Sequence, residues 1–179
     1  MFFTDPLRTP EPERIAARLP RGAAIVFRAF GAPNAGVRAA RLRVIARRRG
    51  LLLLIGADAR LAASSGADGV HLPERLAYRA RRLKAGRPRW IVTAAAHSLG
   101  AARRAARAGA DAVVVSTVFP SASASAGRPL GPRRLAALAR RTGAPVYGLG
   151  GISDENAPRL LDTGLVGLAA VEGLAASIL

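Results

Sequence analysis

One histidine in this sequence of 179 residues stands where acid–base chemistry is expected. His97 follows an apolar run, and an imidazole exchanges protons near neutral pH. We interpret it as a candidate catalytic acid or base; the alternative is a residue that caps the next helix through a neighbouring backbone group. The other histidine, His71, lies between Val70 and Leu72, which favours a structural position within a strand.

Two adjacent glycines are the second feature with a chemical use. Gly150 and Gly151 are followed by Ile152 and by Ser153, where a helix is expected to begin. Backbone N–H groups that converge in such a turn, next to a helix N-terminus, bind phosphate. The alternative is a tight turn without a ligand. The position of the pair after an apolar strand favours the phosphate interpretation.

Three further polar side chains are candidate substrate-binding groups. Arg28 stands near the end of an apolar run, and Ser121 and Ser123 lie in an irregular segment at positions 120–129. A loop of this length in a compact protein is usually functional or mobile. Its serines could hydrogen-bond an anion, although exposed loop serines often have no specific role. The absence of cysteine excludes disulfides, thiolate metal sites and cysteine nucleophiles.

The elements that must position these groups alternate between short apolar runs and longer helical patterns. Such alternation predicts βα units and a parallel sheet. The expected strands cover 2–4, 23–30, 51–55, 69–72, 90–95, 112–118, 145–149 and 167–171. The expected helices cover 11–19, 34–49, 57–65, 74–85, 98–108, 130–142, 153–163 and a short last helix within 173–179. Asn34 and Ser98 are suitable N-caps for two of these helices.

Eight such units that close on themselves form an α/β protein with a (β/α)8 TIM barrel, which we expect as a single domain over residues 1–179. An open doubly wound sheet is the competing architecture. Two helix-to-strand connections, called joints here, have nearly the same sequence, since 66–70 reads GADGV and 109–113 reads GADAV. This recurrence supports a repeated βα unit. Each copy puts a glycine at a helix end, where a left-handed conformation is favourable without a Cβ. We interpret Asp68 and Asp111 as polar groups that stabilise these joints.

The composition indicates the surroundings and partners of the protein. The formal net charge is +17, and Lys84 is the only lysine among 28 basic residues. Because the arginines recur on several helices, we expect a solvated outer ring rather than a nucleic-acid site, although the field could steer an anionic substrate. No apolar run is long enough for a membrane span, and the N-terminus lacks a signal-peptide pattern. We expect a cytoplasmic protein that binds neither nucleic acid nor membrane, with a homodimer left open.

Four segments resemble motifs of the thiamine phosphate synthase and thiazole tautomerase family. They are 66–72 (GADGVHL), 96–99 (AHSL), 118–131 (VFPSAS continuing to PLG) and 150–156 (GGI, then Asn). The corresponding family motifs are GADGVHL, AHS/T-L, VFPTxTK…PLG and GGI…N. The resemblance keeps their order and spacing from Thr4 to Val171, and the first and last motifs together are fairly specific.

The resemblance implies a barrel of thiamin biosynthesis that binds thiazole phosphate. Its phosphate is implied to lie on Gly150, Gly151 and the loop that contains Val171 and Glu172. In the synthase, a pyrimidine diphosphate bound with Mg²⁺ loses diphosphate, and the thiazole nitrogen attacks the pyrimidine methylene. In the tautomerase, a histidine at the position of His97 shuttles a proton on the thiazole precursor. The candidate substrate-binding residues are Arg28, His71, Ser121 and Ser123.

Both usual Mg²⁺ carboxylates of the synthase are replaced in this chain. The family's Asn-Asp pair corresponds to Gly56–Ala57, and its metal-binding aspartate falls within 73–76, which reads PERL. Mg²⁺ beside phosphates needs carboxylate oxygens. We therefore expect no metal site unless Asp58 or Glu74 substitutes.

Cationic positions of the synthase also differ. Its Arg-Glu-Lys triplet becomes Arg-Ala-Phe at 28–30, so only Arg28 remains, and the loop lysine becomes Ala124, with Arg128 near enough to reach back. Glu172 replaces a usual serine and would repel phosphate if its side chain pointed inward.

Four functions stay open. We favour a metal-independent isomerase of the tautomerase type, with His97 as acid and base and no cofactor. The second is a synthase, a transferase with rearranged Mg²⁺ ligands, which predicts Asp58 or Glu74 beside Arg28. The third is a non-catalytic protein that binds a phosphorylated small molecule, favoured if His97 is buried and bonded away from the cavity. A nucleic-acid binder is the fourth, and it would require the arginines to line one face.

Overall fold

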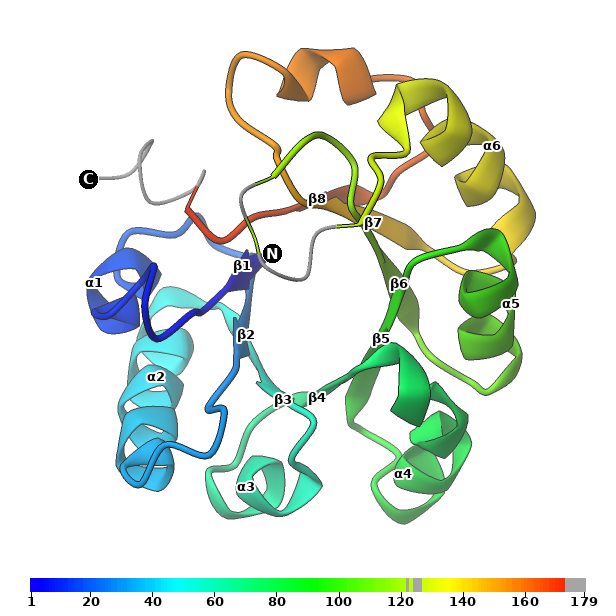
Figure 1. The fold of residues 1–179 in the computed structure, drawn as a ribbon. Coiled ribbons are helices and arrows are strands. Elements are labelled where there is room, and N and C mark those ends of the chain that lie inside the picture. The colour runs from blue at the N-terminus through cyan, green and yellow to red at the C-terminus, as the bar shows by residue number, and fades with distance from the viewer. Residues whose placement is uncertain (122, 124–126, 173–179) are drawn as a thin grey trace.

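The chain folds around a ring of eight parallel strands (Figure 1). This computed structural model describes residues 1–121, 123 and 127–172, so the helix expected within 173–179 lies outside the described residues. The strands are β1 (Phe2–Phe3), β2 (Ala24–Phe27), β3 (Leu52–Gly56), β4 (Gly69–Leu72), β5 (Ile91–Ala96), β6 (Ala112–Ser116), β7 (Val146–Leu149) and β8 (Gly167–Ala169). Each strand pairs in parallel with the next in the sequence.

The ring is closed between the last and first strands. An isolated parallel bridge joins Phe2 to Ala170. The N–H of Phe3 donates to the carbonyl of Ala170 over 2.9 Å, and the N–H of Ala170 donates to the carbonyl of Met1 over 3.0 Å. The predicted (β/α)8 TIM barrel is therefore confirmed, and the open doubly wound alternative is wrong.

Helices surround the ring on its outer side (Figure 1). They are α1 (Pro12–Ala16), α2 (Ala35–Arg49), α3 (Ala59–Ser64), α4 (Ala80–Gly86), α5 (Leu99–Arg107) and α6 (Gly131–Thr142), with two 3₁₀ helices, η1 (Glu74–Arg79) and η2 (Ala157–Leu160). Ser98 caps α5 as predicted, since its Oγ accepts from the N–H of Ala101 over 3.1 Å. Asn34 occupies the N-cap position of α2, but its side chain makes no cap bond.

The helix expected at 153–163 is not an α-helix. Only the short 3₁₀ helix η2 forms there. Pro158 has no N–H to donate to the carbonyl four residues earlier, and Asp162 has a left-handed backbone with φ of +63°. The correction affects the site, because no α-helix N-terminus starts at Ser153 beside the glycine pair.

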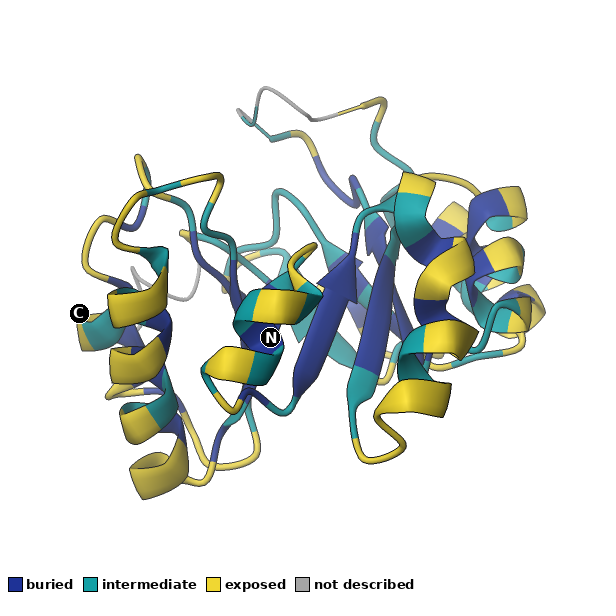
Figure 2. Cartoon of the chain, turned by 90° about the horizontal axis from the view of Figure 1, so that it is seen from below, coloured by how far each residue is buried: buried dark blue, intermediate teal, exposed yellow. Residues whose placement is uncertain are grey.

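Two apolar layers hold the barrel together. Inside the ring, Phe3, Val26, Leu54, Val114 and Ala169 form one buried cluster. The outward side chains of the strands belong to a second, larger cluster with the buried faces of the helices. Figure 2 shows the strands buried and the exposed residues on the outer faces of the helices. Among the described residues, no helix is long and apolar enough to cross a membrane.

The two repeated joints are built as predicted. Asp68 Oδ2 accepts from the N–H of Leu53 over 2.8 Å and from Arg43 over 2.7 Å. Asp111 Oδ2 accepts from the N–H of Val92 over 2.8 Å, and its Oδ1 pairs with Lys84. Each aspartate thus connects the start of the strand that follows it to the neighbouring strand, at the end of the barrel away from the site.

Candidate active site

A cavity of about 370 Å³ lies where the strands end. Seven of the predicted site residues line it, namely Arg28, Ser121, Ser123, Gly150, Gly151, Val171 and Glu172. Barrel enzymes place their chemistry at this end of the sheet, since the loops that follow the strands meet there. The described residues that line the cavity do not include His71 or His97.

The glycine pair forms one wall and requires glycine at both positions. Gly150 has φ of +102° and Gly151 φ of +65°, which side chains with a Cβ rarely adopt. A Cβ on Gly151 would lie 2.3 Å from the carbonyl oxygen of Pro120, and one on Gly150 would lie 2.9 Å from Thr117 Cγ2. The turn is therefore specific to glycine and packs directly on the loop after β6.

Asn156 holds this turn in place. Its Nδ2 donates to the carbonyl of Gly151 over 2.8 Å, and its Oδ1 accepts from the N–H of Ser153 over 3.0 Å. Within 1–121, 123 and 127–172, no group accepts a hydrogen bond from the N–H of Gly151 or Ile152. Because the expected helix N-terminus is absent, these two N–H groups carry the phosphate interpretation.

Arg28 forms the facing wall and is fixed by several partners. Its Nε donates to the carbonyl of Thr4 over 2.7 Å, and its Nη2 lies 3.3 Å from Asp5 Oδ2. Its guanidinium also lies over the rings of Phe3 and Phe30, at 5.7 Å and 5.1 Å from their centroids. Burial lowers the pKa of Arg28 and the charge of Asp5 opposes this, so the side chain stays a cation.

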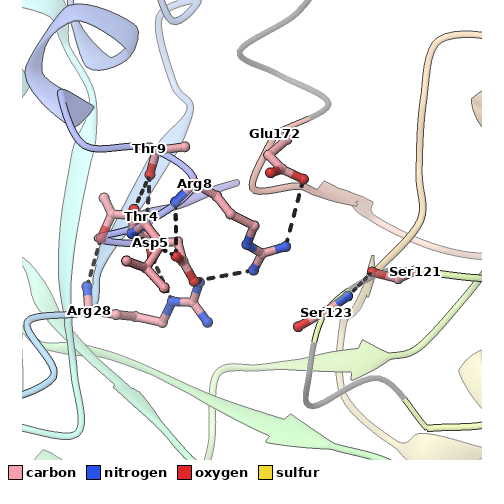
Figure 3. A network of polar contacts seen from close by, with 9 residues as sticks. Thr4, Asp5, Arg8, Thr9, Arg28, Ser121, Ser123 and Glu172 are labelled. Carbon is pink, nitrogen blue, oxygen red and sulfur yellow. Dashed lines mark hydrogen bonds and ion pairs between the residues drawn. The ribbon is translucent and has the colours of Figure 1, made fainter.

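Arg8 is a cavity residue that the sequence analysis missed (Figure 3). Its Nη2 lies 3.2 Å from Asp5 Oδ2, and its Nη1 lies 3.8 Å from Glu172 Oε2. Burial raises the pKa of Asp5, but hydrogen bonds from the N–H groups of Arg8 and Leu7 and from the Arg8 guanidinium outweigh this and lower it. The only signal in the sequence was an arginine three residues after a strand-end aspartate, which is common on protein surfaces.

Glu172 lies in the cavity but is turned toward a cation. Its carboxylate faces Arg8, and its side chain is 59% exposed. The like-charge conflict with phosphate that the sequence suggested is thus reduced by the ion pair. Ser121 and Ser123 come from the loop after β6, across the cavity from Arg28 (Figure 3).

His97 is exposed at the end of β5, beside the cavity. Its Nδ1 lies 3.1 Å from the carbonyl of Ser116, a residue of the cavity wall, and 3.2 Å from Ser116 Oγ. Because a carbonyl only accepts, Nδ1 carries the proton and Nε2 is the basic atom in the neutral ring. The cap of α5 is Ser98, so the interpretation of His97 as a helix cap is wrong.

His71 lies inside the barrel, below the cavity. It is buried, its Nδ1 lies 2.9 Å from Thr93 Oγ1, and its ring meets Phe3 edge-on with centroids 5.0 Å apart. Burial, with a smaller effect from the charge of Arg28, lowers the pKa of His71 to about 3. A neutral, buried ring packed against Phe3 fits the structural position that the sequence favoured, and the substrate-binding role of His71 stays a prediction.

The two carboxylates suggested as substitute metal ligands are used elsewhere. Asp58 is exposed and caps α3, with its Oδ1 accepting from the N–H of Leu61 over 2.9 Å. Glu74 accepts from the N–H of His97 over 3.0 Å and lies 3.5 Å from Arg104. Neither lies beside Arg28 in the cavity. In the part of the chain that the structure describes, no three His, Cys, Asp or Glu residues gather closely enough to hold a metal ion.

Comparisons with known proteins point to one family. A family model described as "Thiamine monophosphate synthase" matches residues 2–174. The thiamine-phosphate synthase of Thiobacillus denitrificans is 33% identical over 93% of this chain and 82% of its own length. That of Alcanivorax borkumensis is 32% identical over 96% and 82%. The solved thiamine phosphate pyrophosphorylase from Pyrococcus furiosus superposes with a TM-score of 0.81, at 28% identity, over 96% of this chain and 84% of that one.

Proposed function

This chain belongs to the thiamine monophosphate synthase family, and on that premise we propose that it is a transferase that joins thiazole phosphate to a pyrimidine carried as its diphosphate. The related proteins named above are synthases, and none of the three carries an isomerase name. The tautomerase-type isomerase that the sequence favoured is therefore replaced by the second alternative, the synthase.

One observation about the cavity carries the proposal. Its two walls present two different groups for anions, the N–H groups after Gly150 on one side and the Arg28 guanidinium on the other. An isomerase of thiazole phosphate needs one anion site and a base inside the cavity, whereas His97 does not line it. A transferase needs one site for the phosphate of the acceptor and one for the departing diphosphate.

The residues support this transfer by binding and by charge. The N–H groups of Gly151 and Ile152 would hold the thiazole phosphate. The bond between the pyrimidine methylene and the diphosphate oxygen breaks, and its electron pair leaves with the diphosphate, whose growing charge Arg28 stabilises. The thiazole nitrogen then forms a bond to the same carbon with its lone pair. No side chain needs to remove a proton.

Mg²⁺, which the family resemblance implies, does not fit the residues at this site. Mg²⁺ is bound through carboxylate oxygens close to the phosphates. Asp58 caps a helix outside the cavity, and Glu74 contacts His97 and Arg104. Asp5, which does lie beside Arg28, already contacts two guanidinium groups. None of the steps above uses a metal ion.

The test is a direct assay of the full chain with both substrates. Thiazole phosphate and the pyrimidine diphosphate are supplied with Mg²⁺ and, separately, with EDTA, and products are separated by chromatography and identified by mass. We expect thiamine phosphate and inorganic diphosphate in equal amounts in both conditions. Both products should be lost in Arg28→Gln and kept in Arg14→Gln, which replaces an exposed arginine on α1. No thiamine phosphate in either condition, with isomerisation of the thiazole or phosphate binding alone, would overturn the proposal.

A further inference from the structure

Arg8 lies on the same wall of the cavity as Arg28 but has no part in the transfer described so far. We propose that Arg8 is a second diphosphate-binding residue. Asp5 positions it, and Glu172 pairs with it until an anion takes the place of Glu172. Its charge replaces the cations and the metal of the family that are missing in this chain. The inference takes only the identity of the ligand, a diphosphate, from the proposed function.

The two guanidinium groups are arranged around one oxygen atom. Arg8 Nη2 and Arg28 Nη2 lie 3.2 Å and 3.3 Å from the same Oδ2 of Asp5 (Figure 3). Each guanidinium has five N–H donors, and these contacts use only some of them. Both arginines line the cavity, with side chains 27% and 23% exposed, so N–H donors of two neighbouring guanidinium groups are available to one ligand in the cavity. Such forks match the geometry of phosphate oxygens.

Asp5 is the fixed member of this cluster. Its Oδ1 accepts from the N–H groups of Leu7 and Arg8 over 3.1 Å and 3.2 Å, and its own N–H donates to Thr9 Oγ1 over 2.7 Å. A carboxylate held by four N–H donors, two from the backbone and two from guanidinium groups, does not exchange easily with a ligand. Asp5 therefore acts as a positioning residue for both arginines.

Glu172 is the exchangeable member. Among the described residues, Glu172 meets the cluster through the 3.8 Å approach of its Oε2 to Arg8 Nη1, which is too long for a hydrogen bond, and its side chain is 59% exposed. An exposed ion pair of this kind contributes little free energy. A diphosphate, with several negative charges and acceptor oxygens, can therefore replace Glu172 at Arg8 without disturbing Asp5.

The surrounding sequence explains why this chain would use Arg8. At 28–30 it reads Arg-Ala-Phe where the resemblance implies Arg-Glu-Lys, so one cation near Arg28 is gone. Phe30 instead lies against the Arg28 guanidinium, 5.1 Å from ring centroid to Cζ. Asp5, the carboxylate in contact with Arg28 among the described residues, already contacts two guanidinium groups. Arg8 restores a positive charge on this wall from the turn that follows β1.

The experiment measures binding of inorganic diphosphate to the full chain by titration calorimetry, in EDTA and at constant ionic strength. We expect binding without a divalent cation. Arg8→Gln should weaken it about tenfold or more, because a charge-assisted pair is lost, and Arg8→Lys should recover part of it. Glu172→Gln should tighten binding several-fold, since the competing carboxylate is removed. The two variants should change the affinity for diphosphate in opposite directions. A general loss of folding would weaken binding in both, so it cannot produce this result.

Arg14→Gln is the matched control. Arg14 also pairs with a carboxylate three residues away, Glu11, over 2.9 Å, but it lies on α1 and does not line the cavity. Its affinity for diphosphate should equal that of the unaltered chain, and thermal unfolding of all variants checks their folding.

The inference is overturned if diphosphate binds only with Mg²⁺, if Arg8→Gln binds like Arg14→Gln, or if Glu172→Gln binds more weakly. Its failure differs from that of the proposed function. If no thiamine phosphate forms but diphosphate still binds through Arg8, the anion site stands and the transferase does not. If thiamine phosphate forms and Arg8→Gln has no effect on diphosphate binding, the transferase stands and the role of Arg8 does not.

Discussion

Asn156 donates a 2.8 Å hydrogen bond from Nδ2 to the carbonyl oxygen of Gly151, and so fixes the glycine turn that follows β7. The carbonyl of Gly151 is thereby held, whereas among the described residues the N–H groups of Gly151 and Ile152, both at the cavity, have no acceptor. The 3₁₀ helix that follows is too short to contribute a helix dipole of any size.

Replacing Asn156 should weaken phosphate binding more than it weakens the fold. Asn156→Ala removes two hydrogen bonds at a half-buried position, each worth about 1 kcal/mol. We expect KM for thiazole phosphate to rise about tenfold with a smaller change in kcat. Asn156→Asp keeps the acceptor for Ser153 but loses the donor and adds a negative charge, so its KM should rise at least as far. Equal KM values for both variants and the unaltered chain would remove Asn156 from the site.

Gly151→Ala should be severely disruptive. The new Cβ would meet the carbonyl of Pro120 at 2.3 Å, on a backbone with φ of +65°. We expect a loss of about 1–3 kcal/mol in the free energy of unfolding together with loss of phosphate binding. Gly36→Ala is the control, since a Cβ there meets nothing within 4 Å and the residue lies in α2, where alanine is preferred. Chemical unfolding and phosphate titration separate the two effects.

His97→Asn distinguishes transfer from isomerisation. The proposed transfer requires no proton from a side chain, so thiamine phosphate formation should change by less than about threefold. An isomerase that used His97 would lose on the order of 10² in rate or more. Both rates are measured on the same preparation. A large loss of transfer with unchanged KM values would assign His97 a part in the reaction.

Asp58→Ala tests the metal interpretation. Asp58 Oδ1 caps α3, so its loss should cost about 1 kcal/mol of stability. The rate of transfer and its response to added Mg²⁺ should stay as in the unaltered chain, because Asp58 is exposed and outside the cavity. A rate that became dependent on higher Mg²⁺ concentration in this variant would contradict that expectation.

Stability should fall with acid because of His71. Its pKa is about 3 in the folded chain and near 6.5 in an unfolded one, so below pH 6.5 the unfolded state binds a proton that the folded state does not. The contribution is complete above pH 6.5 and is lost as the pH falls toward 3, with a limiting slope of about 1.4 kcal/mol per pH unit. Urea unfolding at several pH values measures it. His71→Asn should have a flatter profile than the unaltered chain, and an NMR titration showing His71 protonated near pH 6 would refute the assignment.

Local patterns in the sequence determined the eight strands of the barrel and the helices between them, although not its closure. Alternating apolar runs and helical spacing depend on neighbouring residues only, and so do the glycine joints and the cap at Ser98. The same holds for the Gly150–Gly151 turn, whose backbone demands glycine. Asp68 and Asp111 were also predicted correctly, because each acts at a joint that the local sequence defines.

The tertiary structure alone decided which side chains meet in the cavity. Arg8 and Arg28 are twenty positions apart and come together because β1 and β2 are neighbours, with Asp5 between them. Glu172 reaches Arg8 only because the last strand closes on the first. The sequence favoured a structural position for His71 and a chemical role for His97, and the structure places the first in the buried core and the second at the surface. Such contacts depend on strand register and barrel closure, which long-range packing sets and short patterns do not record.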